Sequence, residues 1–137
     1  MGNAISHFKI NFEDVQYAIN NNYTIINTLN KNENNCLIKN TISYFCEEDT
    51  INGLIDNRKM NTHIVIYGKN VNDDSVVKKK EQLTKLGFIN VYIYTGGLFE
   101  WLCLQDIYGQ EQFPTNVYER DILKYKPLNV LNKLYIN

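Results

Sequence analysis

The second half of the chain alternates between strand-like and helix-like segments with only short connections between them. Residues 63–67 form a short apolar run, which is typical of a strand buried on both faces of a sheet. Residues 75–86 then predict an amphipathic helix, and residues 90–95 a second strand. The side chains expected to face the sheet from that helix are Val76, Leu83 and Leu86. A Gly-Gly turn leads into a last helix over residues 98–108, so this half predicts parallel strands covered by helices.

The first half repeats the alternation. Residues 8–10 predict an edge strand, and the β-branched run at 23–29 a central strand. Between them, Asn11 can cap a helix that runs to about residue 20. The remaining expected elements are a helix at 47–58 and a short helix near 118–125. The pattern therefore predicts an α/β fold with a parallel sheet and helices on both faces.

Length and composition favour one ordinary globular domain. The chain has 137 residues, 44% of them hydrophobic and 21% charged, and a net charge of −1 gives no electrostatic attraction to nucleic acid. Its three cysteines show no Cys-x-x-Cys spacing, so no metal site is predicted. No apolar run approaches the roughly 20 residues that span a bilayer, and we expect a cytoplasmic protein.

Residues 1–6, Met-Gly-Asn-Ala-Ile-Ser, fit the N-myristoylation pattern, with Gly2 as the acceptor and Ser6 at the required spacing. The alternative is a flexible leader over residues 1–7 in which Gly2 and Ser6 coincide by chance. One acyl chain binds membranes only marginally. The pattern therefore predicts, at most, a weak and reversible membrane association.

The glycines that follow the helix of residues 75–86 carry a family resemblance. Gly87 precedes Phe88 and a Val-Tyr strand, and Gly96-Gly97 is followed by Trp101. These residues resemble the catalytic half of a rhodanese domain, and the similarity covers about residues 8–108. It implies a three-layer α/β fold with a central, mostly parallel five-stranded sheet, in which residues 36–42 form a strand. It also implies that Gly96 and Gly97 turn the chain sharply and that Trp101 packs the next helix on the core. Residues 109–137 are then a C-terminal extension packed on the domain.

The same resemblance points to a degenerate active-site loop. In rhodaneses the buried strand ends at a cysteine, and a tight loop wraps its backbone N–H groups around the sulfur; here that place is held by Gly68. The loop consists of Gly68, Lys69, Asn70, Val71, Asn72, Asp73, Asp74 and Ser75. Carboxylates stand where active relatives carry an arginine, and residues 27–29 replace the family's Asp-x-Arg. We therefore predict no catalytic residue, no cofactor and no metal.

Other interpretations of these side chains stay open. Asp73, Asp74 and Ser75 are expected to cap the following helix rather than to act as a base or bind a metal. Lys69 and Asn70 are expected to be solvated, although they could contact a ligand. Cys36 and Cys103 lie among apolar neighbours and predict core packing, whereas Cys46 begins an acidic helix; none falls within the loop. His7 and His63 have no nucleophile at motif spacing.

Three functions are compatible with these features. The favoured one is a catalytically inactive rhodanese-like domain that acts as a binding or regulatory module for an unidentified protein partner or for an anion in the loop. The alternative is a sulfurtransferase or phosphatase-like enzyme that uses a different cysteine, and the third is a membrane-attached adaptor. Aromatic residues after position 108 could form a contact surface or a homo-oligomer seam, although packing within the chain is the preferred explanation.

Overall fold

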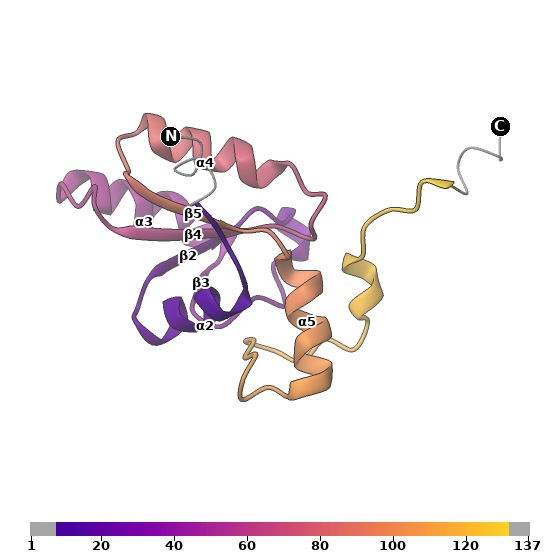
Figure 1. Cartoon of the computed structure of the whole chain (residues 1–137). Coiled ribbons are helices and arrows are strands. Elements are labelled where there is room, and N and C mark those ends of the chain that lie inside the picture. The colour runs from indigo at the N-terminus through magenta and orange to yellow at the C-terminus, as the bar shows by residue number, and fades with distance from the viewer. Residues whose placement is uncertain (1–7, 132–137) are drawn as a thin grey trace.

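The computed structural model describes residues 8–131, and its centre is a five-stranded sheet in the order β1-β5-β4-β2-β3 (Figure 1). The strands are β1 (Lys9–Ile10), β2 (Thr24–Asn27), β3 (Thr41–Ile42), β4 (His63–Tyr67) and β5 (Asn90–Tyr94). Every neighbouring pair is parallel. The carboxyl ends of the strands therefore meet at one edge of the sheet, where ligands of open α/β sheets usually bind.

Four α-helices cover the sheet. They are α2 (Phe12–Asn20), α3 (Tyr44–Asp56), α4 (Ser75–Lys85) and α5 (Gly97–Tyr108), with short 3₁₀ turns η1 (Lys31–Glu33) and η2 (Ile122–Tyr125). α3 and α4 pack on one face of the sheet, and α2 and α5 on the other (Figure 1). This arrangement confirms the predicted three-layer α/β fold. None of these helices combines the length and the apolar character that a bilayer-spanning helix requires.

β4 shows why this sheet needs helices on both sides. Ile64 and Ile66 point into the core with α3 and α4, while Val65 and Tyr67 point into the core with α2 and α5. All four side chains are buried. Because successive side chains of a strand face opposite ways, an uninterrupted apolar run forces burial on both faces.

Local signals in the sequence define several boundaries. Asn11 and Asp14 form a reciprocal capping box at the start of α2, which satisfies two backbone amides. Gly87, with φ +111°, follows α4, and Gly109, with φ +100°, follows α5. Side chains other than glycine rarely adopt such angles. These elements end where the sequence predicted.

The strand expected over residues 36–42 is shorter than predicted. Only Thr41–Ile42 pairs in the parallel sheet, because the preceding apolar residues pair with the C-terminal segment instead. Ile38 forms an isolated antiparallel bridge with Thr115, and the Leu37 carbonyl accepts a hydrogen bond of 3.0 Å from the Asn116 N–H. The sequence correctly predicted burial there but could not identify the pairing partner.

Two other expectations about the α3–α4 layer are wrong in detail. α3 begins at Tyr44 rather than at residue 47, with Ser43 as its N-cap residue. Leu86 does not face the core: it is the C-cap residue that follows α4, and its side chain is 51% exposed. Leu83, one turn earlier, is the buried leucine of this helix.

Within residues 109–131, the segment through η2 packs on the α5 side of the sheet. Phe113 and Tyr125 are buried, and the Trp101 indole N–H donates to the Pro114 carbonyl at 3.2 Å. The Gln105 amide donates to the Phe113 carbonyl at 2.7 Å. The leader of residues 1–7 and the lipid acceptor Gly2 lie outside the described residues.

Candidate functional site

The loop of residues 68–75 connects β4 to α4 at the carboxyl edge of the sheet. β2 ends beside it, because Thr24–Asn27 runs parallel to β4 in register. α5 begins on its other side, at Gly97, the second of the two glycines. The sequence thus brings three chain segments together around the residue that follows the central strand.

Gly97 anchors the loop through its backbone. It has φ +69°, and a Cβ there would lie 2.8 Å from the Asn70 nitrogen and 2.9 Å from the Gly68 oxygen. The Leu98 N–H donates to the Gly68 carbonyl and the Phe99 N–H to the Lys69 carbonyl, each at 2.9 Å. The first turn of α5 therefore holds the loop by contacts that a side chain at position 97 would prevent.

The Asp73 carboxylate turns inward and becomes the anion that the loop binds. One oxygen accepts the Lys69 N–H at 2.8 Å, and the other accepts the Ser75 N–H at 3.0 Å. The Ser75 hydroxyl also hydrogen-bonds the carboxylate, and it lies 2.7 Å from the Thr28 hydroxyl. Hydrogen bonds from backbone amides to a charged acceptor are among the stronger hydrogen bonds in proteins.

This carboxylate occupies the space in front of Gly68. A Cβ at position 68 would overlap one Asp73 oxygen, would lie 2.8 Å from the Asp73 Cγ and would lie 3.0 Å from the Thr28 hydroxyl oxygen. The Gly68 backbone is not in the left-handed region. A side chain here would therefore have to displace the neighbouring carboxylate, whereas the backbone angle would allow it.

The predicted capping role divides unequally among the three loop residues. Asp73 accepts the Ser75 amide at the start of α4, as a residue near a helix N-terminus is expected to do. Asp74 occupies the N-cap position but makes no side-chain cap hydrogen bond, so its expected contribution is wrong. Ser75 supplies a hydroxyl to the Asp73–Thr28 network instead.

Lys69 and Asn70 are more constrained than expected for solvated loop residues. The Lys69 ammonium forms an ion pair of 2.9 Å with Glu33, and the Asn70 amide donates to the Tyr125 carbonyl at 2.9 Å. The Asn70 side-chain oxygen accepts the Asn72 N–H at 3.0 Å. Val71 and Asn72 form the exposed tip. The polar groups of this loop thus mainly bind other parts of the chain.

Residues 27–29 also contribute to the site. Asn27 is only 4% exposed; its amide donates to the Asn34 side chain at 3.0 Å, and its oxygen accepts the Leu29 N–H at 3.1 Å. Thr28 reaches Ser75 and Gly68, as described above. Its role was missed at the sequence level, because only the strand order of the folded sheet shows that the residue after β2 lies beside the loop that leaves β4.

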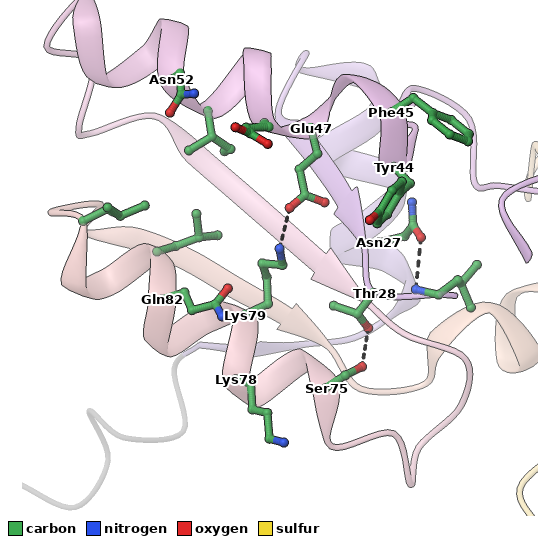
Figure 2. A pocket seen from close by; sticks show the side chains of 15 residues that line it. Asn27, Thr28, Tyr44, Phe45, Glu47, Asn52, Ser75, Lys78, Lys79 and Gln82 are labelled. Atoms are coloured by element: carbon green, nitrogen blue, oxygen red, sulfur yellow. Dashed lines mark hydrogen bonds and ion pairs between the residues drawn. The ribbon is translucent and has the colours of Figure 1, made fainter. Parts of the chain in front are cut away.

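Two hollows flank the network. The first, of about 670 Å³, lies between α3 and α4 and reaches from Thr28 and Ser75 at one end to Leu86 at the other (Figure 2). Figure 2 shows Lys79 reaching from α4 to Glu47 on α3, and this ion pair crosses the hollow. The second, of about 520 Å³, lies between the loop and residues 126–130, and Thr28 and Ser75 line it too. Neither Glu47 nor Lys79 was predicted to take part.

Comparison with known proteins gives the family. The family model of the rhodanese-like domain matches residues 13–103, which is more than half of the chain. The chain belongs to the rhodanese-like domain family. No curated protein is similar enough in sequence to match.

Solved structures agree with this fold. A full-length protein from Lactobacillus plantarum superposes with a TM-score of 0.60 at 16% identity, covering 85% of this chain and 92% of that one. The rhodanese-like domain of the Alr3790 protein from Anabaena gives a TM-score of 0.57 at 19% identity, covering 90% and 87%. A yeast protein tyrosine phosphatase of the rhodanese family gives 0.52 at 12% identity, covering 83% and 95%. At these identities the similarity shows the fold alone.

None of the cysteines of this rhodanese-like domain lines either hollow beside the loop. Cys36 is buried, and its thiol lies 3.6 Å from the Val117 carbonyl oxygen; burial raises its pKa. Burial also raises the pKa of Cys103 on α5. Cys46 is exposed near the start of α3. A raised pKa disfavours the thiolate, the form that acts as a nucleophile.

The remaining candidates lie away from the loop or form no metal site. His63 begins β4, and its ring stacks at 4.6 Å on Tyr23 and at 6.0 Å on Tyr92. The strand runs from there toward Gly68, so His63 stands at the opposite end from the loop. Within residues 8–131, no cluster of three or more His, Cys, Asp or Glu side chains could hold a metal ion.

Proposed function

We propose that this protein is a catalytically inactive rhodanese-like domain that acts as a binding or regulatory module. The observation that carries the proposal is the Asp73 carboxylate, which fills the space in front of Gly68 and takes the Lys69 and Ser75 amides. Sulfur transfer needs a thiolate at that place to attack the substrate and carry the group. Here the place holds glycine, and a side chain with no transferable sulfur covers it.

The electrostatics of the loop support the same proposal. Active-site loops that hold sulfur or phosphorus oxyanions use convergent amides and a cation. In this loop Asp73 takes two of the amides, and Glu33 binds the ammonium of Lys69. An incoming oxyanion would have to displace one carboxylate and meet another nearby. Binding through the outer surface of the module is therefore favoured over binding of a small anion at the loop floor.

The direct test is a pair of activity assays on the purified chain. In thiosulfate:cyanide sulfurtransferase assays, an active thiolate takes the outer sulfur of thiosulfate, releases sulfite and passes that sulfur to cyanide as thiocyanate. We expect no turnover from the unaltered protein in this assay or with an aryl phosphate. Turnover that disappears when Cys36, Cys46 or Cys103 is replaced by serine would show that another cysteine serves the site and would refute the proposal.

The scaffold can be tested separately from the missing nucleophile. Gly68→Cys alone should stay inactive, because its side chain meets the Asp73 carboxylate. Gly68→Cys combined with Asp73→Ala removes that carboxylate and returns two amides to the loop floor. Persulfide formation by the double variant, followed by mass spectrometry after thiosulfate treatment, would support a retained frame. Equal reactivity of Gly68→Cys with and without Asp73 would contradict the role given to the carboxylate.

We further propose that Gly2 accepts a myristoyl group and that the protein associates reversibly with membranes. The support is the pattern of residues 1–6, which places a small hydroxyl residue at position 6. Intact-mass spectrometry of protein produced in a eukaryotic cell tests the modification. A free or acetylated N-terminus would refute it.

A further inference from the structure

We infer that the outer face of α4, together with Lys9, is a docking surface for the anionic headgroups of a lipid bilayer. This inference deepens the proposed membrane association, because it names the surface and the lipid chemistry. It does not itself require the acyl chain. We call this surface the α4 basic face, and its residues are Lys9, Lys78, Lys80 and Lys85.

The position of α4 leaves this face uncovered. α4 packs on the sheet through Leu83, and Figure 1 shows the helix along the outside of the molecule. Lys78 and Lys85 are exposed and seven residues apart, so both project from the same side of the helix. Glu81 is the acidic residue within α4 and offsets one of these charges.

The lysines of the α4 basic face are available to an external anion. Lys79, the remaining lysine of the helix, already forms an ion pair with Glu47 and is therefore not part of the α4 basic face. Within residues 8–131, no carboxylate forms an ion pair with Lys9, Lys78, Lys80 or Lys85. The face therefore keeps four ammonium groups against one carboxylate.

Two of these ammonium groups converge on one aromatic ring. The Lys80 Nζ lies 4.6 Å from the centroid of the Phe8 ring, and the Lys9 Nζ lies 6.0 Å from it. Two like charges near one small ring repel each other, and each ring contact offsets only part of that cost. A phosphate or carboxylate headgroup between them would turn this repulsion into attraction.

Apolar side chains accompany the charges. Val77 on α4 is 48% exposed, Leu86 at its end is 51% exposed, and Ile89 just beyond is 75% exposed. A surface that mixes lysine with exposed aliphatic groups suits the interface of a bilayer, where long basic side chains reach the headgroups and apolar groups enter the boundary of the acyl region.

The described chain also begins on this face, at Phe8. Five residues lie between Gly2 and Phe8, which makes six residue steps, and an extended chain covers at most about 3.6 Å per step. An acyl group on Gly2 would thus be attached within about 22 Å of the Phe8 backbone. Stable membrane attachment generally needs an acyl chain plus a basic patch, and the two signals would here act on the same side of the molecule.

The test is sedimentation of the full chain with vesicles, in unmodified and N-myristoylated form. Vesicles of phosphatidylcholine alone are compared with vesicles that also contain phosphatidylserine. The test variant carries Lys78→Gln, Lys80→Gln and Lys85→Gln. The control variant carries Lys31→Gln, Lys39→Gln and Lys126→Gln, three exposed lysines outside this face, so that both variants change the net charge equally.

We expect the myristoylated protein to bind vesicles with phosphatidylserine much more tightly than vesicles without it. Each lysine near an anionic surface contributes about fivefold to binding, so the test variant should lose roughly a hundredfold. The control should lose little, and added salt should weaken only the binding that depends on phosphatidylserine. Thermal melts confirm that both variants fold.

The outcomes separate the two proposals. If Gly2 proves unmodified in cells, the lipidation proposal fails, while the unmodified protein still tests the α4 basic face through its weak binding to vesicles with phosphatidylserine. Equal losses in the test and control variants would show a net-charge effect without a defined face. Absence of any phosphatidylserine dependence in the myristoylated protein would overturn the inference.

Discussion

The relation between Gly68 and Asp73 can be measured as a coupling free energy. Gly68→Ala adds one methyl group where the backbone angle tolerates it, but that carbon would overlap an Asp73 carboxylate oxygen and lie 2.8 Å from the Asp73 Cγ. The carboxylate must then move away and lose the Lys69 and Ser75 amides. Hydrogen bonds to charged groups contribute about 1.5–3 kcal/mol each, so the loss of both should lower the free energy of unfolding of Gly68→Ala by about 3–6 kcal/mol.

Removal of the carboxylate should abolish that penalty. Asp73→Ala costs a similar amount by itself, since it leaves the same two amides without their acceptor. In the Asp73→Ala background, the nearest atom that the new methyl group meets outside residue 73 is the Thr28 hydroxyl oxygen at 3.0 Å, which can rotate away. Gly68→Ala should then cost less than about 1 kcal/mol, because alanine also reduces the entropy of the unfolded chain. The coupling free energy between the two positions is therefore expected to be about −2 to −6 kcal/mol.

Urea unfolding of the four proteins gives this coupling directly. Gly53→Ala is the matched control: it lies within α3, has open space around its Cβ and should stabilise by about 0.5–1 kcal/mol. If the effects of Gly68→Ala and Asp73→Ala add within about 0.5 kcal/mol, the carboxylate does not fill the space in front of position 68.

Three further changes test other contacts by urea unfolding. Gly97→Ala combines φ +69° with a Cβ 2.8 Å from the Asn70 nitrogen and should lower the free energy of unfolding by more than about 3 kcal/mol. Gly109→Ala has φ +100° and open space around its Cβ, so it should cost only the backbone strain of about 1–2 kcal/mol. Equal costs would contradict the claim that the first turn of α5 holds the loop. Trp101→Phe should cost about 2–3 kcal/mol through the cavity and the unpaired Pro114 carbonyl, and a loss below about 1 kcal/mol would show that residues 109–131 add little there. Burial raises the pKa values of the Tyr67 and Tyr94 hydroxyls in the folded state, so the unfolded chain loses these protons at lower pH. Above about pH 10 the free energy of unfolding should therefore fall by about 1.4 kcal/mol per pH unit for each tyrosine. Tyr67→Phe should remove one such contribution, and an unchanged slope would contradict the assignment.

The sheet was predictable because its signals are local. Each signal determines the structure of residues close to it in the sequence: the apolar run forms β4, the amphipathic pattern forms α4, and the glycines end α4 and α5. The pairing of Ile38 with Thr115 was not predictable in this way, because the two residues are far apart in sequence and only the folded chain brings them together. The same limit explains why the short strand β3 was expected to be longer.

The candidate site divides along the same line. The absence of a cysteine at position 68 and the acidic residues at 73 and 74 are visible in the sequence. The roles of the two carboxylates cannot be seen in the sequence, because Asp73 and Asp74 are the same residue type and differ in the direction of their side chains. The Asp73 carboxylate turns into the loop, whereas the Asp74 carboxylate makes no cap hydrogen bond. The contribution of Thr28 depends on strand order, which a sequence pattern does not specify.

The glycine at position 68 and the carboxylate at position 73 make sense only as a pair. A cysteine at position 68 beside Asp73 would overlap the carboxylate, and a thiolate there would face a like charge that disfavours its formation. A glycine at position 68 without Asp73 would leave the Lys69 and Ser75 amides without the acceptor that they now have. Neither single change leaves all the polar groups of the loop satisfied, so thiol chemistry at position 68 would require both. The loop is held by the first turn of α5, and its amides bind a carboxylate from its own chain. Under the proposed function, the outer faces of the domain are then the surfaces through which it would bind a partner.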